Sequence, residues 1–171
     1  ADRDGPQKLF VKVIGDGSPE QPLFQSDVPF KNPASWSPDG QWIALTQLDP
    51  GTAQNVWLLP VSGKHDLTPL VHGPTRDNGG PISPDGRWLA YTSDITGRFQ
   101  LYVQSFPEPG RPVQVSQESA SASWWTRDGR QLLFLGDDLH SLWRVDVERG
   151  GAAPRTGTPK KMATLPSNVV G

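Results

Sequence analysis

The chain has 171 residues, which is enough for one domain with a buried core. Its 18 glycines and 18 prolines make up about a fifth of the residues, against an ordinary ~12%, and this leaves little room for long helices. The net charge is only -2 and both signs are spread along the chain, so the basic footprint of a nucleic-acid-binding protein is absent. No apolar run approaches the ~20 residues of a membrane span, and the lack of cysteine excludes disulfides and thiol chemistry.

The first 30 residues predict two β-strands, near residues 9–14 and 23–25. The segment "ADRDGPQKLFVKVIG" aligns under "SDITGRFQLYVQSFP" at residues 93–107, with Asp2 on Asp94, Gly5 on Gly97 and Phe10 on Tyr102. In this alignment the chain begins inside a repeated unit whose first two strands are missing. Residues 1–30 are therefore predicted to be part of one unit.

A phrase of eleven residues then occurs three times, as "WSPDGQWIALT", "ISPDGRWLAYT" and "WTRDGRQLLFL". Its aspartates lie 46 and 43 residues apart, and a period of this length is typical of propellers and solenoids. Proline presets φ at the first central position of a turn, aspartate accepts backbone hydrogen bonds, and glycine permits positive φ, so the phrase predicts a tight hairpin. The residues assigned to these turns are Asp39, Gly40, Asp85, Gly86, Asp128 and Gly129.

Each turn is followed by three further strand patterns. The second strand of each unit is apolar at successive positions, which indicates a strand covered on both faces. The expected second strands are residues 42–45, 88–91 and 132–135; the third are 56–58, 101–103 and 142–144; the fourth are 67–71, 113–116 and 161–165. Four antiparallel strands in about 45 residues, sandwiched on both faces, describe a blade of a β-propeller.

The predicted fold is therefore an all-β propeller, or partial propeller, with about three and a half four-stranded blades. We divide the single domain into a blade part at 1–30, blades at 31–75, 76–120 and 121–166, and an extra strand at 167–171. Closed propellers use about four to eight blades. Three arrangements are then open: the chain is an excerpt of a longer propeller, its tail closes a four-bladed ring, or two chains share the closure in a homo-oligomer. We favour the excerpt, and an unpaired sheet edge invites pairing with another chain.

The repeat resembles that of the TolB-like propellers, in which an S-P-D-G hairpin recurs once per blade, and the resemblance covers nearly the whole chain. Residues 83–135 are also similar to the propeller segments that follow the kinase domain of certain bacterial serine/threonine kinases. Those units read S-P-D-G-R-W-[LI]-A-Y-x-S, then [IL]-Y-V-x-x-F-P, then W-x-x-D-G. The resemblance implies an extracytoplasmic or periplasmic setting and a role as a sensor or interaction module.

We expect no catalytic, cofactor or metal site in this chain. The kinase signatures and the G-x-S-x-G elbow of serine hydrolases are absent from the sequence. Three scattered histidines, His65, His72 and His140, lack zinc-ligand spacing. We expect the motif aspartates to stabilise their own turns rather than to form a ring of carboxylates that binds a cation. The pairs 77–78 and 137–138 fit solvated loops better than calcium sites.

Trp124 breaks the repeat, since its counterparts are Ser35 and Pro81. Side chains alternate across a strand, so Trp124 should point opposite to Trp125. It is expected either to form an apolar wall near the mouth of a central channel or to fill space between blades. The loops that precede the first strands would lie near the same mouth, and with Trp124 they give the candidate binding residues Trp124, Arg76, Asp77, Asn78, Glu118 and Ser119.

Three functions remain open from the sequence. The leading hypothesis is a non-catalytic module that recognises a protein or peptide partner, with neither nucleic acid binding nor membrane insertion in this segment. The second is an accessory propeller that gates a prolyl oligopeptidase-type peptidase. The third is a metal-dependent propeller hydrolase or lactonase, for which the sequence shows no convergent acidic set.

Overall fold

The computed structural model describes residues 7–26, 30–49, 53–148 and 150–166, and these contain β-strands and no helix. They form one two-stranded sheet and three four-stranded antiparallel sheets. The strands of the first two sheets are β1 (Gln7–Val11), β2 (Gln21–Ser26), β3 (Phe30–Trp36), β4 (Trp42–Leu48), β5 (Gln54–Pro60) and β6 (Thr68–Val71). Those of the last two are β7 (Asp77–Ile82), β8 (Trp88–Ser93), β9 (Gln100–Ser105), β10 (Val113–Gln114), β11 (Ala120–Trp125), β12 (Gln131–Gly136), β13 (Ser141–Asp146) and β14 (Lys160–Thr164).

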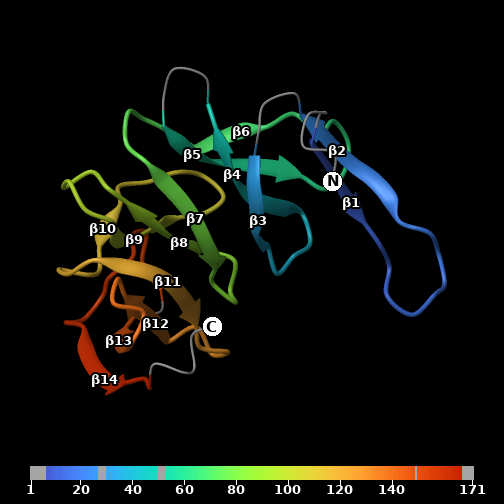
Figure 1. The fold of residues 1–171 in the computed structure, drawn as a ribbon. Helices are drawn as coiled ribbons and strands as arrows, with labels where there is room; N and C mark the ends of the chain where they lie inside the picture. Colours follow the sequence, from blue (N-terminus) through green and yellow to red (C-terminus); the bar gives the residue numbers. More distant parts are fainter. Residues whose placement is uncertain (1–6, 27–29, 50–52, 149, 167–171) are drawn as a thin grey trace.

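In each four-stranded sheet the strands are neighbours in chain order. Figure 1 shows the four sheets following one another in an arc, with β3, β7 and β11 on the inner side. This is the arrangement of consecutive propeller blades, and the predicted all-β propeller class with about three and a half blades is confirmed. The arc is not closed. The predicted strand at residues 167–171, and the alignment of Asp2 and Gly5, lie outside the described residues.

The repeated phrase forms the corner between the first and second strands of each sheet. Ser37 Oγ donates to Asp39 Oδ1 at 2.5 Å and accepts from the Trp42 N–H at 2.9 Å, while the Gly40 N–H donates to the Ser37 carbonyl at 2.9 Å. Gly40 has a φ of 75°, a region that side chains avoid. The next corner repeats these bonds at Ser83, Asp85, Gly86 and Trp88.

The third corner has Thr126 and Arg127 in place of serine and proline, yet its hydrogen bonds are the same. Thr126 Oγ1 donates to Asp128 Oδ1 at 2.7 Å and accepts from the Gln131 N–H at 3.0 Å. A threonine hydroxyl therefore substitutes for that of serine. The aspartate and glycine that both versions share carry the turn.

The corners also stack on one another around the arc. A Cβ built on Gly129 would lie 3.5 Å from Cδ of Pro84 in the preceding corner, and one on Gly86 would lie 3.9 Å from Cδ of Pro38. Each proline thus has a second role, since its ring covers the glycine of the following corner. The three corners therefore point the same way.

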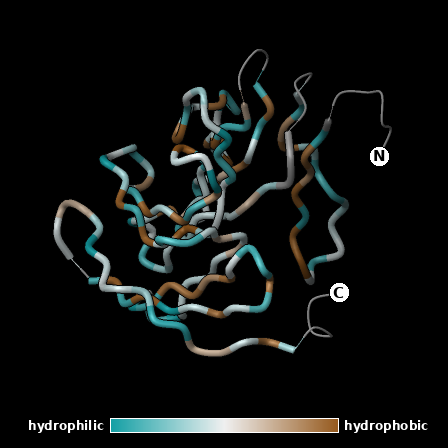
Figure 2. Tube along the Cα trace, turned by 60° about the vertical axis from the view of Figure 1, so that its left-hand side comes forward, coloured by the Kyte–Doolittle hydropathy of each residue, from teal (hydrophilic) through white to brown (hydrophobic). Residues whose placement is uncertain are grey.

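Apolar side chains fill the spaces between successive sheets, and Figure 2 shows hydrophobic stretches inside the stacked sheets with hydrophilic stretches in many connecting loops. Along β4, Ile43 and Leu45 pack toward β1 and β2, whereas Ala44 packs toward the following sheet. Along β8, Leu89 and Tyr91 pack backward, and Trp88 and Ala90 pack forward. The continuous apolar pattern of each second strand is thus explained by burial on both faces.

The inner strand β7 lies unusually close to its neighbours because it contains two glycines. A Cβ on Gly79 would be 3.2 Å from Cβ of Ala34, and one on Gly80 would be only 2.6 Å from the carbonyl oxygen of Ala90. Two hydrogen bonds join β7 to the preceding sheet: the Gly79 N–H to Thr46 Oγ1 at 2.9 Å and the Ile82 N–H to Ser35 Oγ at 3.0 Å. A side chain at Gly79 would crowd the preceding sheet, and one at Gly80 would collide with the backbone of β8 in the same sheet.

The corner glycines give the first testable prediction. Gly129→Ala should destabilise the fold by about 1 to 2 kcal/mol, because its φ of 67° disfavours any side chain. Gly73→Ala is the matched control: Gly73 is not in the positive-φ region and its Cβ would meet only Thr75 Oγ1 at 3.9 Å. Urea unfolding of both variants measures the difference. Equal stabilities would contradict the turn assignment.

The stacked sheets give the second prediction. Leu89 is fully buried between two sheets, so Leu89→Ala should lower the free energy of unfolding by roughly 2 to 5 kcal/mol. Leu48→Ala removes the same atoms at a position 47% exposed and should change it by less than about 1 kcal/mol. Thermal denaturation followed by circular dichroism checks both. Similar losses in the two variants would show that the interfaces between sheets do not carry the fold.

Candidate functional site

The loops at the end of the sheets opposite the corners are tied together by charged side chains. We call the segments 72–76, 94–99 and 117–119 the entrance loops, because two of them precede inner strands. Arg76 Nε donates to Asp94 Oδ2 at 2.7 Å, and the Arg76 N–H donates to Asp94 Oδ1 at 2.8 Å. These bonds lower the pKa of the Asp94 carboxyl, the backbone N–H being the larger cause. The Arg76 guanidinium also lies 5.2 Å from the centre of the Phe99 ring.

Arg98 and Glu118 form the second charged pair of these loops. Arg98 Nη1 is 3.4 Å from Glu118 Oε2, and Arg98 Nη2 donates to the Gln117 carbonyl at 2.8 Å. Gln100 Nε2 donates to the same carbonyl at 2.6 Å. The loop before β11 is therefore held on the loop between β8 and β9. Ser119 follows it and is half-buried beside the first residue of β11.

Asp77 and Asn78 lie at the start of β7 rather than in a loop. Asp77 is only 2% exposed and its carboxylate accepts from Thr75 Oγ1 at 3.1 Å. Burial raises the pKa of Asp77, although hydroxyl groups nearby oppose the shift. Asn78 is half-buried and pairs with Thr92 of β8. Of these two candidates, Asp77 is a structural group inside the sheet.

Trp124 lies at the other end of its strand from Glu118 and Ser119. It is the fifth residue of β11, next to the corner, and is 48% exposed. It pairs with Leu133, whose neighbours Leu132 and Phe134 pack against the preceding sheet. Because paired residues share a face, Trp124 points to the open side of the last sheet. The structure does not bring it together with the entrance loops.

Trp125 and Trp36 occupy equivalent positions, but only Trp125 is covered by a preceding sheet. Trp125 Nε1 donates to the Pro81 carbonyl of the preceding sheet at 3.0 Å, and its ring packs on the buried cluster there. Trp36 occupies the corresponding place in β3 and is 49% exposed, because the preceding sheet has no inner strand among the described residues. Trp36 and Trp124 thus mark the two uncovered ends of the arc.

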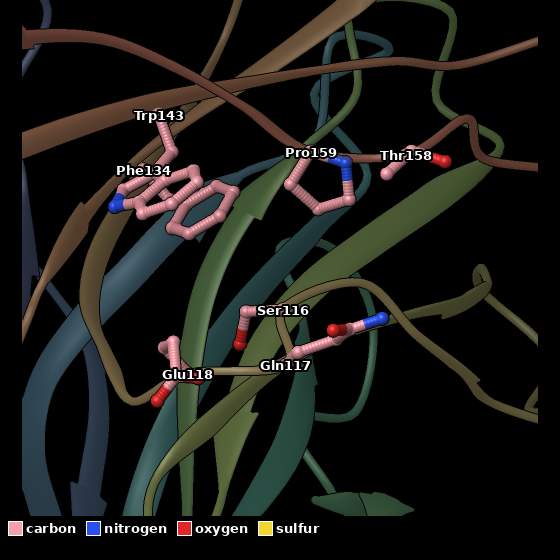
Figure 3. A pocket seen from close by; sticks show the side chains of 7 residues that line it. All are labelled: Ser116, Gln117, Glu118, Phe134, Trp143, Thr158 and Pro159. Atoms are coloured by element: carbon pink, nitrogen blue, oxygen red, sulfur yellow. The ribbon is translucent and has the colours of Figure 1, made fainter.

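A pocket that the sequence did not predict lies between the last two sheets. Its volume is about 170 Å³, and it is lined by Ser116, Gln117, Glu118, Phe134, Trp143, Thr158 and Pro159. Figure 3 shows the rings of Phe134, Trp143 and Pro159 on one side and residues 116–118 across from them. The Phe134 and Trp143 rings are stacked, with centroids 6.2 Å apart and planes inclined by 7°. The only sequence signal was the recurrence of aromatic residues on paired strands.

Asp138 and Asp49, which lie outside the entrance loops, each accept several local hydrogen bonds. Asp138 accepts from Ser141 Oγ at 2.5 Å and from the N–H groups of Ser141 and His140, and the Ser141 hydroxyl is the main cause that lowers its pKa to about 2. Asp49 is buried and accepts from Gln47, Asn55 and Trp57 side chains. In the described part of the chain no three His, Cys, Asp or Glu side chains are grouped as metal ligands.

Comparisons with known proteins place the fold. No family model matches the chain. Dipeptidyl aminopeptidase BIII of Pseudoxanthomonas mexicana is 29% identical over 103 residues, which are 56% of this chain and 15% of that protein. Uncharacterized protein Atu1656 of Agrobacterium fabrum is 27% identical over 106 residues, 60% of this chain and 35% of that protein. The chain thus spans a minor part of either relative.

Solved structures match a larger share of this chain than the two sequence relatives do. A TolB from Acinetobacter baumannii superposes with a TM-score of 0.65 at 18% identity, covering 92% of this chain and 39% of its own. A putative TolB from Agrobacterium tumefaciens gives 0.64 at 19% identity, covering 86% and 55%. A prolyl endopeptidase gives 0.56 at 16% identity, covering 94% and 25%. The chain therefore has the fold of TolB-like propellers.

Proposed function

We propose that the chain is a non-catalytic part of a TolB-like propeller that binds a protein or peptide partner through its entrance loops. The observation that carries the proposal is the set of opposite charges held on one end of the sheets. The side chains of Arg76, Arg98 and Glu118 are 60%, 52% and 74% exposed, yet each is fixed by a hydrogen bond or an ion pair. Charges of both signs in fixed positions select a partner by complementarity.

The proposed setting is extracytoplasmic, where the propeller would act as a sensor or interaction module. The TolB fold supports the interaction role. The sensor role extends the expected likeness of residues 83–135 to kinase-linked propeller segments. Among the described residues, no helix is long and apolar enough to cross a membrane.

We also propose that the single domain divides into a blade part at 1–30, blades at 31–75, 76–120 and 121–166, and a further strand at 167–171, within a longer propeller. Exposure of Trp36 and Trp124 at the two ends of the arc supports this arrangement, since the equivalent positions inside the arc contact another sheet. Further blades of the same polypeptide, or a second copy of the chain, would cover these ends.

A second candidate function is an accessory propeller that gates a peptidase. It is favoured by the relative named as a dipeptidyl aminopeptidase and by the superposition on a prolyl endopeptidase. The chain alone should then release no p-nitroaniline from dipeptidyl p-nitroanilides. A G-x-S-x-G segment in the same reading frame would favour gating over the interaction module.

The entrance loops give the third prediction. Peptides selected from a random phage-displayed library on the folded chain should bind Arg98→Ala and Arg76→Ala at least tenfold more weakly, because each change removes a fixed positive charge. Arg155→Ala is the matched control: this arginine is 80% exposed, is paired with Glu148 at 3.9 Å, and lies outside the loops. Isothermal calorimetry gives the affinities, and circular dichroism confirms the fold. Affinities unchanged by both loop variants, or equally reduced by the control, would overturn the proposal.

A further inference from the structure

The two interfaces between four-stranded sheets contain the same kind of aromatic pair. In the first interface, Tyr91 of β8 and Tyr102 of β9 are stacked with centroids 5.7 Å apart. In the second, Phe134 of β12 and Trp143 of β13 take the corresponding places, since each pair joins opposite residues of the second and third strands and faces the preceding sheet. The tyrosines are only 4% and 7% exposed, whereas Trp143 is only partly buried.

The two interfaces also contain different residues at equivalent positions. The first contains Leu70, which lies in the fourth strand β6, and Phe106, which directly follows the third strand β9. The second contains Val115 and Val147 in the same buried roles. Phe106 and Val147 are equivalent because the Phe106 N–H donates to the Arg87 carbonyl and the Val147 N–H donates to the Arg130 carbonyl, the arginines that follow the corner glycines. Each interface contains four aromatic residues, but their positions differ: the first has Phe106 where the second has Val147, and the second has Trp125 where the first has Ile82.

The pocket beside Trp143 is the size of one such ring. Its volume of about 170 Å³ is close to that of an engineered apolar cavity of roughly 150 Å³ that binds benzene. Aromatic rings prefer an offset stacked or edge-on ring neighbour, which Trp143 and Phe134 offer on one wall. The pocket thus has the volume and the surface to take a ring from outside.

The opposite wall is polar and acidic. It consists of Ser116, Gln117 and Glu118, and Glu118 is the one charged residue among the seven that line the pocket. A carboxylate has about four acceptor positions, and Arg98 approaches one oxygen of Glu118 at a long 3.4 Å. This wall favours a ligand that presents a hydrogen-bond donor.

We propose that this pocket binds one donor-bearing aromatic side chain, a tyrosine phenol in the simplest case, presented by a peptide partner. The ring stacks on Trp143, and the phenol hydroxyl donates to the acceptors of residues 116–118. The source of the ring rests on the proposed function, because it belongs to the partner that the entrance loops bind. The pocket adjoins those loops through Gln117 and Glu118.

The experiment is a titration of the whole chain with p-cresol, the side chain of tyrosine, followed by two-dimensional amide NMR. The expected result is a saturable shift of the Trp143 indole N–H and of the amides of residues 116–118. The matched ligand 4-methylcyclohexanol has the same size and hydroxyl group but no aromatic ring, and it should bind at least fivefold more weakly. Shifts that do not saturate, or equal binding of both ligands, would overturn the proposal, as would binding of tetramethylammonium in preference to p-cresol.

Two variants locate the site. Trp143→Leu removes the stacking surface, so it should weaken p-cresol binding at least tenfold while the spectrum stays folded. If this variant does not fold, Glu118→Ala, at an exposed residue of the opposite wall, removes the carboxylate acceptor and should also weaken p-cresol binding. Leu48→Ala, on an exposed part of the second sheet, should bind as the wild type does. Unchanged binding to a folded pocket variant would overturn the assignment.

The titration requires no partner, so its failure is separate from failure of the proposed function. Peptides that lose affinity for Arg98→Ala while p-cresol does not bind would support the entrance loops and reject the pocket. The reverse pattern would support the pocket and reject the loops.

Discussion

The whole structure depends on the burial of apolar sheet faces against one another. Exposing the apolar residues of either sheet face to water is unfavourable, so each four-stranded sheet requires a neighbour on both sides. Leu89 and Ala90, adjacent in one strand, belong to two different interfaces, which shows that a single strand serves both neighbours. Gly79 of β7 extends this constraint to the backbone, because it lets the inner strand approach the sheet before it.

Polar groups organise the ends of the sheets. At one end, the serine or threonine of each corner bonds the aspartate two residues later and the strand that follows. At the other end, a carboxylate after each second strand bonds nearby groups: Asp49 holds Asn55 and Trp57, Asp94 holds Arg76, and Asp138 holds Ser141. These carboxylates lie 9 or 10 residues after the corner aspartates, and each has different partners. Because these carboxylates have different partners, the loops at this end of the sheets differ in chemistry, although the corners at the other end are nearly identical.

The interfaces differ in how completely they are filled. The first interface buries the stacked pair Tyr91 and Tyr102, whereas the second has a pocket beside the stacked pair Phe134 and Trp143. The pocket and the entrance loops share Gln117 and Glu118, so a partner could contact both at once. Because the sheets themselves are rigidly packed, such a site would be largely formed before binding.

The corners and strand order could be predicted from the sequence because they depend on local chemistry. Glycine at positive φ, an aspartate that accepts from the backbone and an apolar run are readable in a few consecutive residues, and they recur at a regular period. The strand ends were less predictable: residues 9–14 were expected as a strand, but β1 is Gln7–Val11, and β10 has only two residues. Strand ends depend on pairing partners that are distant in sequence.

The direction of Trp124, the burial of Asp77 and the pocket beside Trp143 were decided by tertiary structure alone. Whether Trp124 faces a channel or a missing neighbour depends on the register of β11 with β12. Asp77 was expected in a loop before the strand, yet it is the first residue of β7 and is buried. The pocket lies where residues 116–118, which follow one sheet, meet Phe134, Trp143 and residues 158–159 of the next, and these segments are distant in sequence. Local sequence thus determined the repeated sheet, and contacts between sheets determined which of its surfaces a partner could reach.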